Sequence, residues 1–252
     1  MSSFLSHLER PVSKAAFVAH RLASRIGLPA SAIMPLRDQV HGRFVHPDMT
    51  LLLRPGSWDA WTAHPGHEPE THRHIAESYT PEAGYLFDVG AFCGSFSLRH
   101  RKQFEGIVAF EASSENYAAL SRNIAQNDGN VTAVNAAVAD TPGTLRLYLN
   151  TSDTHSLIGD GGYEEVRATT LDESWDQAGR PKVALIKIDV EGAEPGVIRG
   201  ATELLKTFPD LIAEANDEAA AEELRSLMQA RGYTQRRVLD DRNLLFGHAS
   251  AA

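Results

Sequence analysis

Cysteine is almost absent from this chain, and long apolar runs are absent altogether. Cys93 is the single cysteine among 252 residues, so no disulfide can form within the chain, which fits a reducing compartment. No apolar run approaches the ~20 residues that a membrane-spanning helix needs. Charged residues interrupt the N-terminal stretch where a signal peptide would have its apolar core. We therefore expect a cytoplasmic protein with no stable insertion into a membrane.

Positive charge is also scarce. The chain has 24 Lys and Arg residues against 33 Asp and Glu, which gives a net charge of −9. An acidic chain has little general affinity for a phosphate backbone, so nucleic acid is not an expected partner. The hydrophobic content of 42% is ordinary for a globular protein, and the length suits one sizeable α/β domain with a modest extension.

The chain divides near residue 80. Residues 1–80 contain spaced prolines, an amphipathic helix predicted over 13–26, and short strands predicted over 42–45 and 51–53. We expect this N-terminal extension to pack on the main domain, where it could form a lid over the acceptor. The alternative is a helix that lies on a membrane surface. Residues 81–252 alternate strands and helices and end in a predicted hairpin, which indicates a mostly parallel sheet covered on both faces, with one antiparallel strand.

One segment has the pattern of a nucleotide-cofactor loop. It reads LFDVGAFCGSFS, from Leu86 to Ser97, and predicts a buried strand, an acid at its end, a glycine-containing turn and the start of a helix. Gly90 and Gly94 permit a tight turn and a close approach of ligand to backbone, and Ser95 could cap the helix. Several cofactors use such a loop, so the segment alone leaves the cofactor open.

A second acid strengthens the cofactor prediction. Glu111 ends the next predicted strand, about 20 residues after Asp88, which is the position of a carboxylate that binds the two ribose hydroxyls of a nucleoside. The alternative is a solvated glutamate at a strand end.

Further polar residues follow the later strands of the main domain. Asp189 and Glu191 lie after the fourth predicted strand, and Glu214 and Asn216 after the fifth. Asp189, Glu214 and Asn216 offer oxygen ligands that suit Mg²⁺ or another divalent cation. Hydrogen-bonded loop side chains are the alternative interpretation. His155, after the third strand, could serve as a general base near the cofactor.

Taken together, these motifs resemble one family. FDVGAFCGSFS, VAFEASSENYAALSRNIAQN, VNAAVAD with GTLRLYL, and IKIDVEGAEPGVIRGA are similar to segments of the FkbM family of S-adenosylmethionine-dependent methyltransferases. The resemblance implies a class I, Rossmann-like methyltransferase fold with a seven-stranded sheet whose last strand is antiparallel. It also implies S-adenosylmethionine as cofactor and, most often, methylation of a hydroxyl oxygen.

The resemblance also assigns residues by position. Asp189 and Glu191 would face the methyl group, and with His155 they are the candidate catalytic residues. The implied cofactor-binding positions are Asp88, Gly90, Ala91, Phe92, Gly94, Ser95, Glu111, Ala112, Ser113, Asn116, Ala137, Val138 and Asp189.

Phe92 departs from the family pattern, which usually has asparagine at this position. The side-chain contact expected there is therefore in doubt, although backbone contacts of the loop would survive.

The sequence predicts an O-methyltransferase acting on a small-molecule or glycan acceptor, such as a sugar, glycolipid or natural product, with a homodimer left open. A non-catalytic cofactor-binding module is the alternative that Phe92 favours. An NAD-dependent oxidoreductase is disfavoured because the loop lacks the G-x-G-x-x-G spacing.

Overall fold

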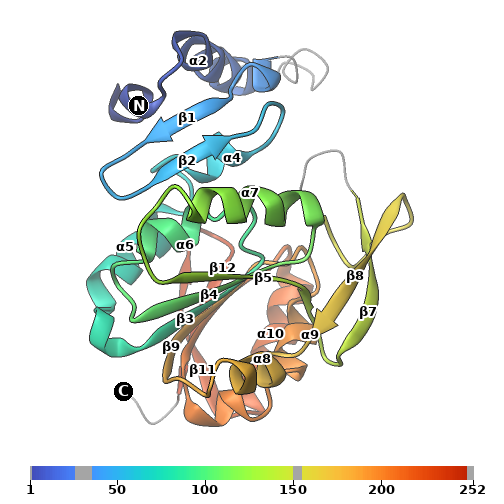
Figure 1. The fold of residues 1–252 in the computed structure, drawn as a ribbon. Coiled ribbons are helices and arrows are strands. Elements are labelled where there is room, and N and C mark those ends of the chain that lie inside the picture. The colour runs from blue at the N-terminus through green and yellow to red at the C-terminus, as the bar shows by residue number, and fades with distance from the viewer. Residues whose placement is uncertain (1, 26–35, 150–154, 249–252) are drawn as a thin grey trace.

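A seven-stranded sheet forms the centre of the molecule. The computed structural model describes residues 2–25, 36–149 and 155–248 (Figure 1). The strands follow the order β11-β12-β10-β9-β3-β4-β5. Their bounds are β3 (Tyr85–Val89), β4 (Gly106–Glu111), β5 (Val131–Asn135), β9 (Val183–Ile188), β10 (Asp210–Glu214), β11 (Tyr233–Leu239) and β12 (Asn243–His248).

The last strand enters the sheet antiparallel, between β10 and β11. The pairs β3–β4, β4–β5, β3–β9 and β9–β10 are parallel, whereas β12 runs antiparallel to both of its neighbours. A short hairpin turn forces this reversal, because parallel neighbours need a long crossover. The predicted fold class, with its antiparallel last strand, is confirmed.

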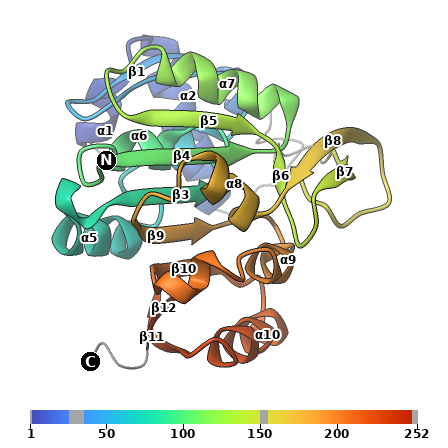
Figure 2. The same ribbon diagram turned by 60° about the horizontal axis from the view of Figure 1, so that its bottom comes forward.

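Helices cover both faces of the sheet, as the continuous apolar strands require. One face carries α5 (Pro69–Ser78), α6 (Ser95–His100) and α7 (Ser114–Ile124), and the other carries α8 (Leu171–Gln177), α9 (Glu194–Arg199) and α10 (Glu218–Gln229) (Figures 1 and 2). Every residue of β4 is buried. Short 3₁₀ turns, η1 (Pro81–Ala83) and η2 (Leu204–Thr207), lead into β3 and β10. Because β3, β4, β5, β9 and β10 run in the same direction, their carboxyl ends lie at one edge of the sheet.

The N-terminal extension forms a further layer against α7 (Figure 1). It contains α1 (Ser2–His7), α2 (Pro11–Arg25), a hairpin of β1 (Gly42–Val45) and β2 (Thr50–Leu53), and α4 (Asp59–Thr62). Phe17 of α2 is fully buried in a cluster that includes Leu98 of α6. The helix and both strands predicted here are confirmed, and β2 contacts α7 of the main domain. None of the helices in the described ranges has the length and apolarity needed to cross a bilayer.

Asn123 of α7 and Asn127, just after this helix, attach the hairpin to the main domain. The Asn123 side chain accepts a hydrogen bond from the Leu52 N–H at 2.7 Å, and Asn127 accepts one from the Thr50 N–H at 2.8 Å and returns one to the Thr50 carbonyl at 2.8 Å. A free strand edge presents unpaired backbone groups. The asparagines satisfy those of β2, so the hairpin is held in a defined position beside α7.

A separate three-stranded sheet stands beside the main one. It has the order β6-β8-β7 and consists of β6 (Ala137–Val138), β7 (Gly143–Tyr148) and β8 (Tyr163–Thr169). It projects from the molecule near the end of β5 (Figures 1 and 2). The loop between β7 and β8 includes residues 150–154, which lie outside the described part of the chain.

Candidate functional site

A cavity of about 580 Å³ opens at the carboxyl edge of the sheet. Open α/β sheets bind ligands at this edge, because the loops that follow neighbouring parallel strands converge there. Segments after β3, β4, β5, β9 and β10 line the cavity, together with the turn between β11 and β12. The N-terminal extension closes it with Trp58, Thr62, Gly66, His67, Glu68 and Pro69. The cavity is large enough for a cofactor and part of an acceptor.

The cofactor loop follows β3 in a conformation that its glycines permit. Gly90 has φ 88°, and a Cβ at this position would lie 1.8 Å from the carbonyl oxygen of Asp189, so the loop passes directly against the loop after β9. Phe92 also has a positive φ, 53°, which is uncommon for a bulky residue. Its side chain lines the cavity, and its backbone N–H turns inward toward Glu111.

Glu111 lies at the base of this loop with its carboxylate held by backbone donors. One oxygen accepts a hydrogen bond from the Phe92 N–H at 2.8 Å, and the other accepts one from the Ser113 N–H at 2.9 Å. Burial raises the pKa of the Glu111 carboxyl to about 7, although these bonds and the nearby Arg54 charge act in the opposite direction. Each carboxylate oxygen has two acceptor sites. The two backbone donors and the Asn116 side chain occupy three of these four sites, so one remains for a ribose hydroxyl, and the carboxylate fits the ribose of S-adenosylmethionine.

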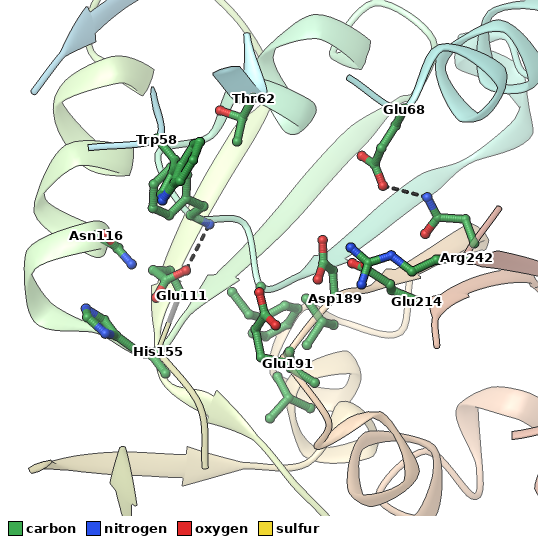
Figure 3. A pocket seen from close by; sticks show the side chains of 18 of the residues that line it. Trp58, Thr62, Glu68, Glu111, Asn116, His155, Asp189, Glu191, Glu214 and Arg242 are labelled. Carbon is green, nitrogen blue, oxygen red and sulfur yellow. Dashed lines mark hydrogen bonds and ion pairs between the residues drawn. The ribbon is translucent and has the colours of Figure 1, made fainter. Parts of the chain in front are cut away.

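The opposite side of the cavity carries a buried cluster of charges. The Lys187 ammonium contacts Asp189 Oδ2 at 3.1 Å and Glu68 Oε1 at 3.5 Å, and only 3% of the Lys187 side chain is exposed. Burial acts to lower the pKa of Lys187, but Asp189 and Glu68 raise it overall. Burial and the adjacent Asp189 charge raise the pKa of Glu214, with which Asp189 shares a hydrogen bond. Figure 3 shows Asp189 and Glu214 together, across the cavity from Glu111 and Asn116.

Cations of the chain already surround the predicted metal ligands. Arg242 contacts Glu214 at 3.1 Å and donates a hydrogen bond to the amide oxygen of Asn216 at 3.2 Å, while Lys187 contacts Asp189. In the part of the chain that the structure describes, no three His, Cys, Asp or Glu side chains are arranged to hold a metal ion. The arrangement does not fit a divalent cation, and metal dependence remains a prediction.

The structure brings most of the predicted site residues to one cavity. Those that line it are Gly90, Phe92, Glu111, Ala112, Asn116, Ala137, Val138, His155, Asp189, Glu191 and Glu214. The other predicted cofactor residues are buried without lining it: Asp88, Ala91, Gly94, Ser95 and Ser113. Asn216 is exposed.

The predicted residues that are buried without lining the cavity stabilise the loops around it. Asp88 accepts a hydrogen bond from the Ser97 hydroxyl at 2.5 Å, which ties the end of β3 to α6, and burial raises its pKa to about 6. Ser113 caps α7 by accepting from the Asn116 N–H at 3.4 Å. Gly94 adopts φ 85° at the start of α6. These residues hold the loops whose other members face the cavity.

Sequence reasoning missed the cavity residues that come from distant segments. Trp58 and Glu68 of the extension line the cavity, and Arg54 of the extension contacts its lining residues Asn116 and Phe92. No motif marked Arg54 or Trp58. Lys187 did leave a signal, because it is the one charged residue in an otherwise apolar strand. A charge at a buried strand position requires a partner, and Glu68 and Asp189 are the partners found.

Fold and cavity together define the class of this protein. The strand order with an antiparallel last strand is that of the class I methyltransferases, and an acid after β4 faces a cavity at the carboxyl edge. The chain belongs to the methyltransferase FkbM domain family, whose model matches residues 88–234, more than half of it. This match confirms the resemblance found in the sequence motifs.

Individual relatives are more distant. Methyltransferase sdnD of Sordaria araneosa is 31% identical over 161 residues, which cover 49% of this chain and 62% of that protein. The match thus spans less than two thirds of the relative. Among solved structures, TYW2 of M. jannaschii in complex with AdoMet has a TM-score of 0.47 at 13% identity, covering 82% of this chain and 83% of that one. ChlM of Synechocystis PCC 6803 with bound SAM has a TM-score of 0.45 at 11% identity, covering 76% and 82%. The fold assignment rests on the strand order and not on these likenesses.

Proposed function

We propose that this protein transfers the methyl group of S-adenosylmethionine to a hydroxyl oxygen of a small-molecule or glycan acceptor. The observation that carries the proposal is a single cavity with a ribose-type carboxylate, Glu111, on one side and the acidic residues Asp189, Glu191 and Glu214 on the other. Family membership supports the cofactor. When bound, the cofactor supplies an electrophilic methyl carbon on a sulfonium sulfur.

The residues of the chain would then hold and deprotonate the acceptor. Attack by the acceptor oxygen forms the new C–O bond while the C–S bond breaks and its electron pair stays on sulfur. The hydroxyl proton needs a base within hydrogen-bond reach. Asp189, Glu191 and His155 are the candidates, and all three face the cavity (Figure 3). Alignment of the reacting atoms supplies much of the rate enhancement, because the methyl donor is already activated.

The charge of the acceptor side favours a neutral acceptor. Glu68, Asp189, Glu191, Glu214, Asp240 and Asp241 all line the cavity. A phosphate-rich acceptor would be repelled by this wall, which supports the expectation that nucleic acid is not the acceptor. We also place the protein in the cytoplasm, on the sequence expectations alone.

Calorimetric titration tests the cofactor first. We expect binding of S-adenosylmethionine and no binding of NAD; the reverse result would contradict the proposal.

Turnover is then followed with radiolabelled methyl donor and a panel of sugars, glycolipids and polyketide-type compounds. Asp189→Asn, Glu191→Gln and His155→Phe separate the candidate bases, because the base variant loses kcat while the Kd for S-adenosylhomocysteine stays the same. Because Lys187 and Arg242 already contact the predicted metal ligands, we expect activity to persist in excess chelator. Loss of activity that a divalent cation restores would contradict this expectation.

A binding module without turnover is the second candidate, and Phe92 is the observation that favours it. Phe92 occupies the cavity wall at a position where the family usually has asparagine. A module would bind S-adenosylmethionine with the affinity of the enzyme but transfer methyl to no acceptor in the panel. Transfer to any acceptor would refute this candidate.

A further inference from the structure

Arg54 lies just beyond β2, in the N-terminal extension, and its guanidinium is held rigidly. Nη2 contacts Asp59 Oδ1 at 2.8 Å, Nε donates to Asp59 Oδ2 at 3.2 Å, and the Arg54 backbone N–H donates to the same carboxylate at 2.8 Å. Asp59 is fully buried, and the Arg54 side chain is only 10% exposed. A bidentate, buried pair of this kind fixes the direction in which the remaining guanidinium N–H groups point.

The Nη1 side of this guanidinium is connected to the ribose carboxylate through one intermediate residue. Arg54 Nη1 donates to Asn116 Oδ1 at 2.8 Å. A guanidinium has only donors, so it requires the amide oxygen of Asn116 to face it. The amide NH₂ group is thereby directed the other way, toward Glu111, with which Asn116 shares a side-chain hydrogen bond. Asp59 thus binds Arg54, Arg54 binds Asn116, and Asn116 binds Glu111.

The same guanidinium also contacts the cofactor loop. Its central carbon lies 5.1 Å from the centroid of the Phe92 ring, which is a cation–π distance. The Phe92 N–H donates to Glu111, so Arg54 supports both neighbours of the ribose carboxylate: the loop on one side and the amide on the other. An asparagine at position 92 could not make this ring contact, which accounts for phenylalanine at this place in the present chain.

We propose that Arg54 is a positioning residue of the cofactor site, which orients Asn116 and Phe92 so that Glu111 presents its remaining acceptor site to a ribose hydroxyl. The N-terminal extension then contributes to recognition of the cofactor and is more than a cover for the acceptor. The inference rests on the proposed function, because it assumes that Glu111 binds the ribose. Arg54 itself acts through Asn116 and Phe92.

The test compares two ligands in three variants by calorimetry. The ligands are S-adenosylhomocysteine and its 2′-deoxy analogue, which lacks a ribose hydroxyl that Glu111 would bind. Arg54→Met alone would leave Asp59 as a buried unpaired charge and could prevent folding, so the test variant is Arg54→Met with Asp59→Asn. Asn116→Ala breaks the same connection while leaving the Arg54–Asp59 pair in place. The matched control is Arg43→Met, on the same hairpin, whose exposed side chain pairs only with Glu9 among the contacts of the described chain.

The wild type and the control are expected to prefer S-adenosylhomocysteine over the analogue by about tenfold or more, as a hydrogen bond to a charged group implies. In the double variant and in Asn116→Ala, the preference should shrink to about twofold or less. Most of the loss of affinity should affect S-adenosylhomocysteine, which carries the 2′-hydroxyl. A purely structural role would weaken both ligands equally and leave the ratio unchanged, and that result in either folded variant overturns the inference. If the wild type binds neither ligand, the proposed function itself fails, which is a different outcome.

Discussion

Lowering the pH through neutrality is expected to weaken binding of the nucleoside half of the cofactor, because Glu111 takes up a proton. Burial raises the pKa of this carboxyl to about 7 in the ligand-free protein. Its two oxygens already accept two backbone hydrogen bonds and one from the Asn116 side chain, so the ionised form is needed to accept a ribose hydroxyl as well. Since protonation competes with the ligand, affinity must fall as the pH drops below the pKa and level off above it.

The size of the effect follows from that pKa. At about pH 6 only about one tenth of the Glu111 carboxyls are ionised, whereas nearly all are ionised at about pH 8. If only the ionised form binds well, the affinity at the lower pH is about tenfold weaker, or about 1.4 kcal/mol. Above about pH 8 the profile is flat.

The assay uses 5′-methylthioadenosine, which carries the ribose and adenine without the amino acid. This choice matters because Asp88, with a pKa raised to about 6 by burial, lies near the end of β3, beside the loop that the family resemblance assigns to the methionine half. Calorimetric affinities are compared for the wild type, Glu111→Gln and Glu105→Gln, an exposed carboxylate just before β4 as the control. Glu111→Gln should bind weakly at every pH, and the control should follow the wild type. A flat wild-type profile, or a slope that survives in Glu111→Gln, would refute the reasoning.

Three substitutions test the packing around the site. Gly90→Ala places a Cβ 1.8 Å from the Asp189 carbonyl oxygen and should lower the free energy of unfolding by about 3 kcal/mol or more in urea. Lys187→Met leaves Asp189 and Glu68 without their buried cation and should cost about 3 kcal/mol at neutral pH. Asp240→Ala removes the carboxylate that accepts from two N–H groups of the first turn of α5. It should cost about 1 kcal/mol and speed hydrogen exchange of those amides.

The fold was predictable because its signals are local. Apolar strand runs and helical periodicity identified the parallel sheet, and the closing hairpin indicated the antiparallel last strand, as β12 confirms. Glu111 was predicted to be a site residue from its place at a strand end. The carboxyl ends of parallel strands share one edge, so strand-end positions are brought together by topology alone.

Other predictions depended on side-chain direction, which sequence position does not give. Asp88 and Ser113 belong to the right loops, yet both are buried and act by hydrogen bonds to Ser97 and to Glu111. Asp189, Glu214 and Asn216 were predicted to share a cation. The structure instead supplies Lys187 and Arg242 to them, from a strand interior and a distant turn.

The sequence by itself determined the class of sheet, the edge where ligands bind and the carboxylate expected to hold the ribose, since each follows from residues close together along the chain. Only the tertiary structure decided what surrounds that carboxylate. Arg54 and Asn116 are 62 residues apart in the sequence. Lys187 belongs to β9 in the sheet, and its partner Glu68 belongs to the N-terminal extension. Such contacts depend on how the N-terminal extension packs against α7 and the sheet edge, which no local pattern records. The cofactor loop is therefore recognisable from sequence, whereas the reason for phenylalanine at position 92 emerges from the guanidinium that lies over its ring.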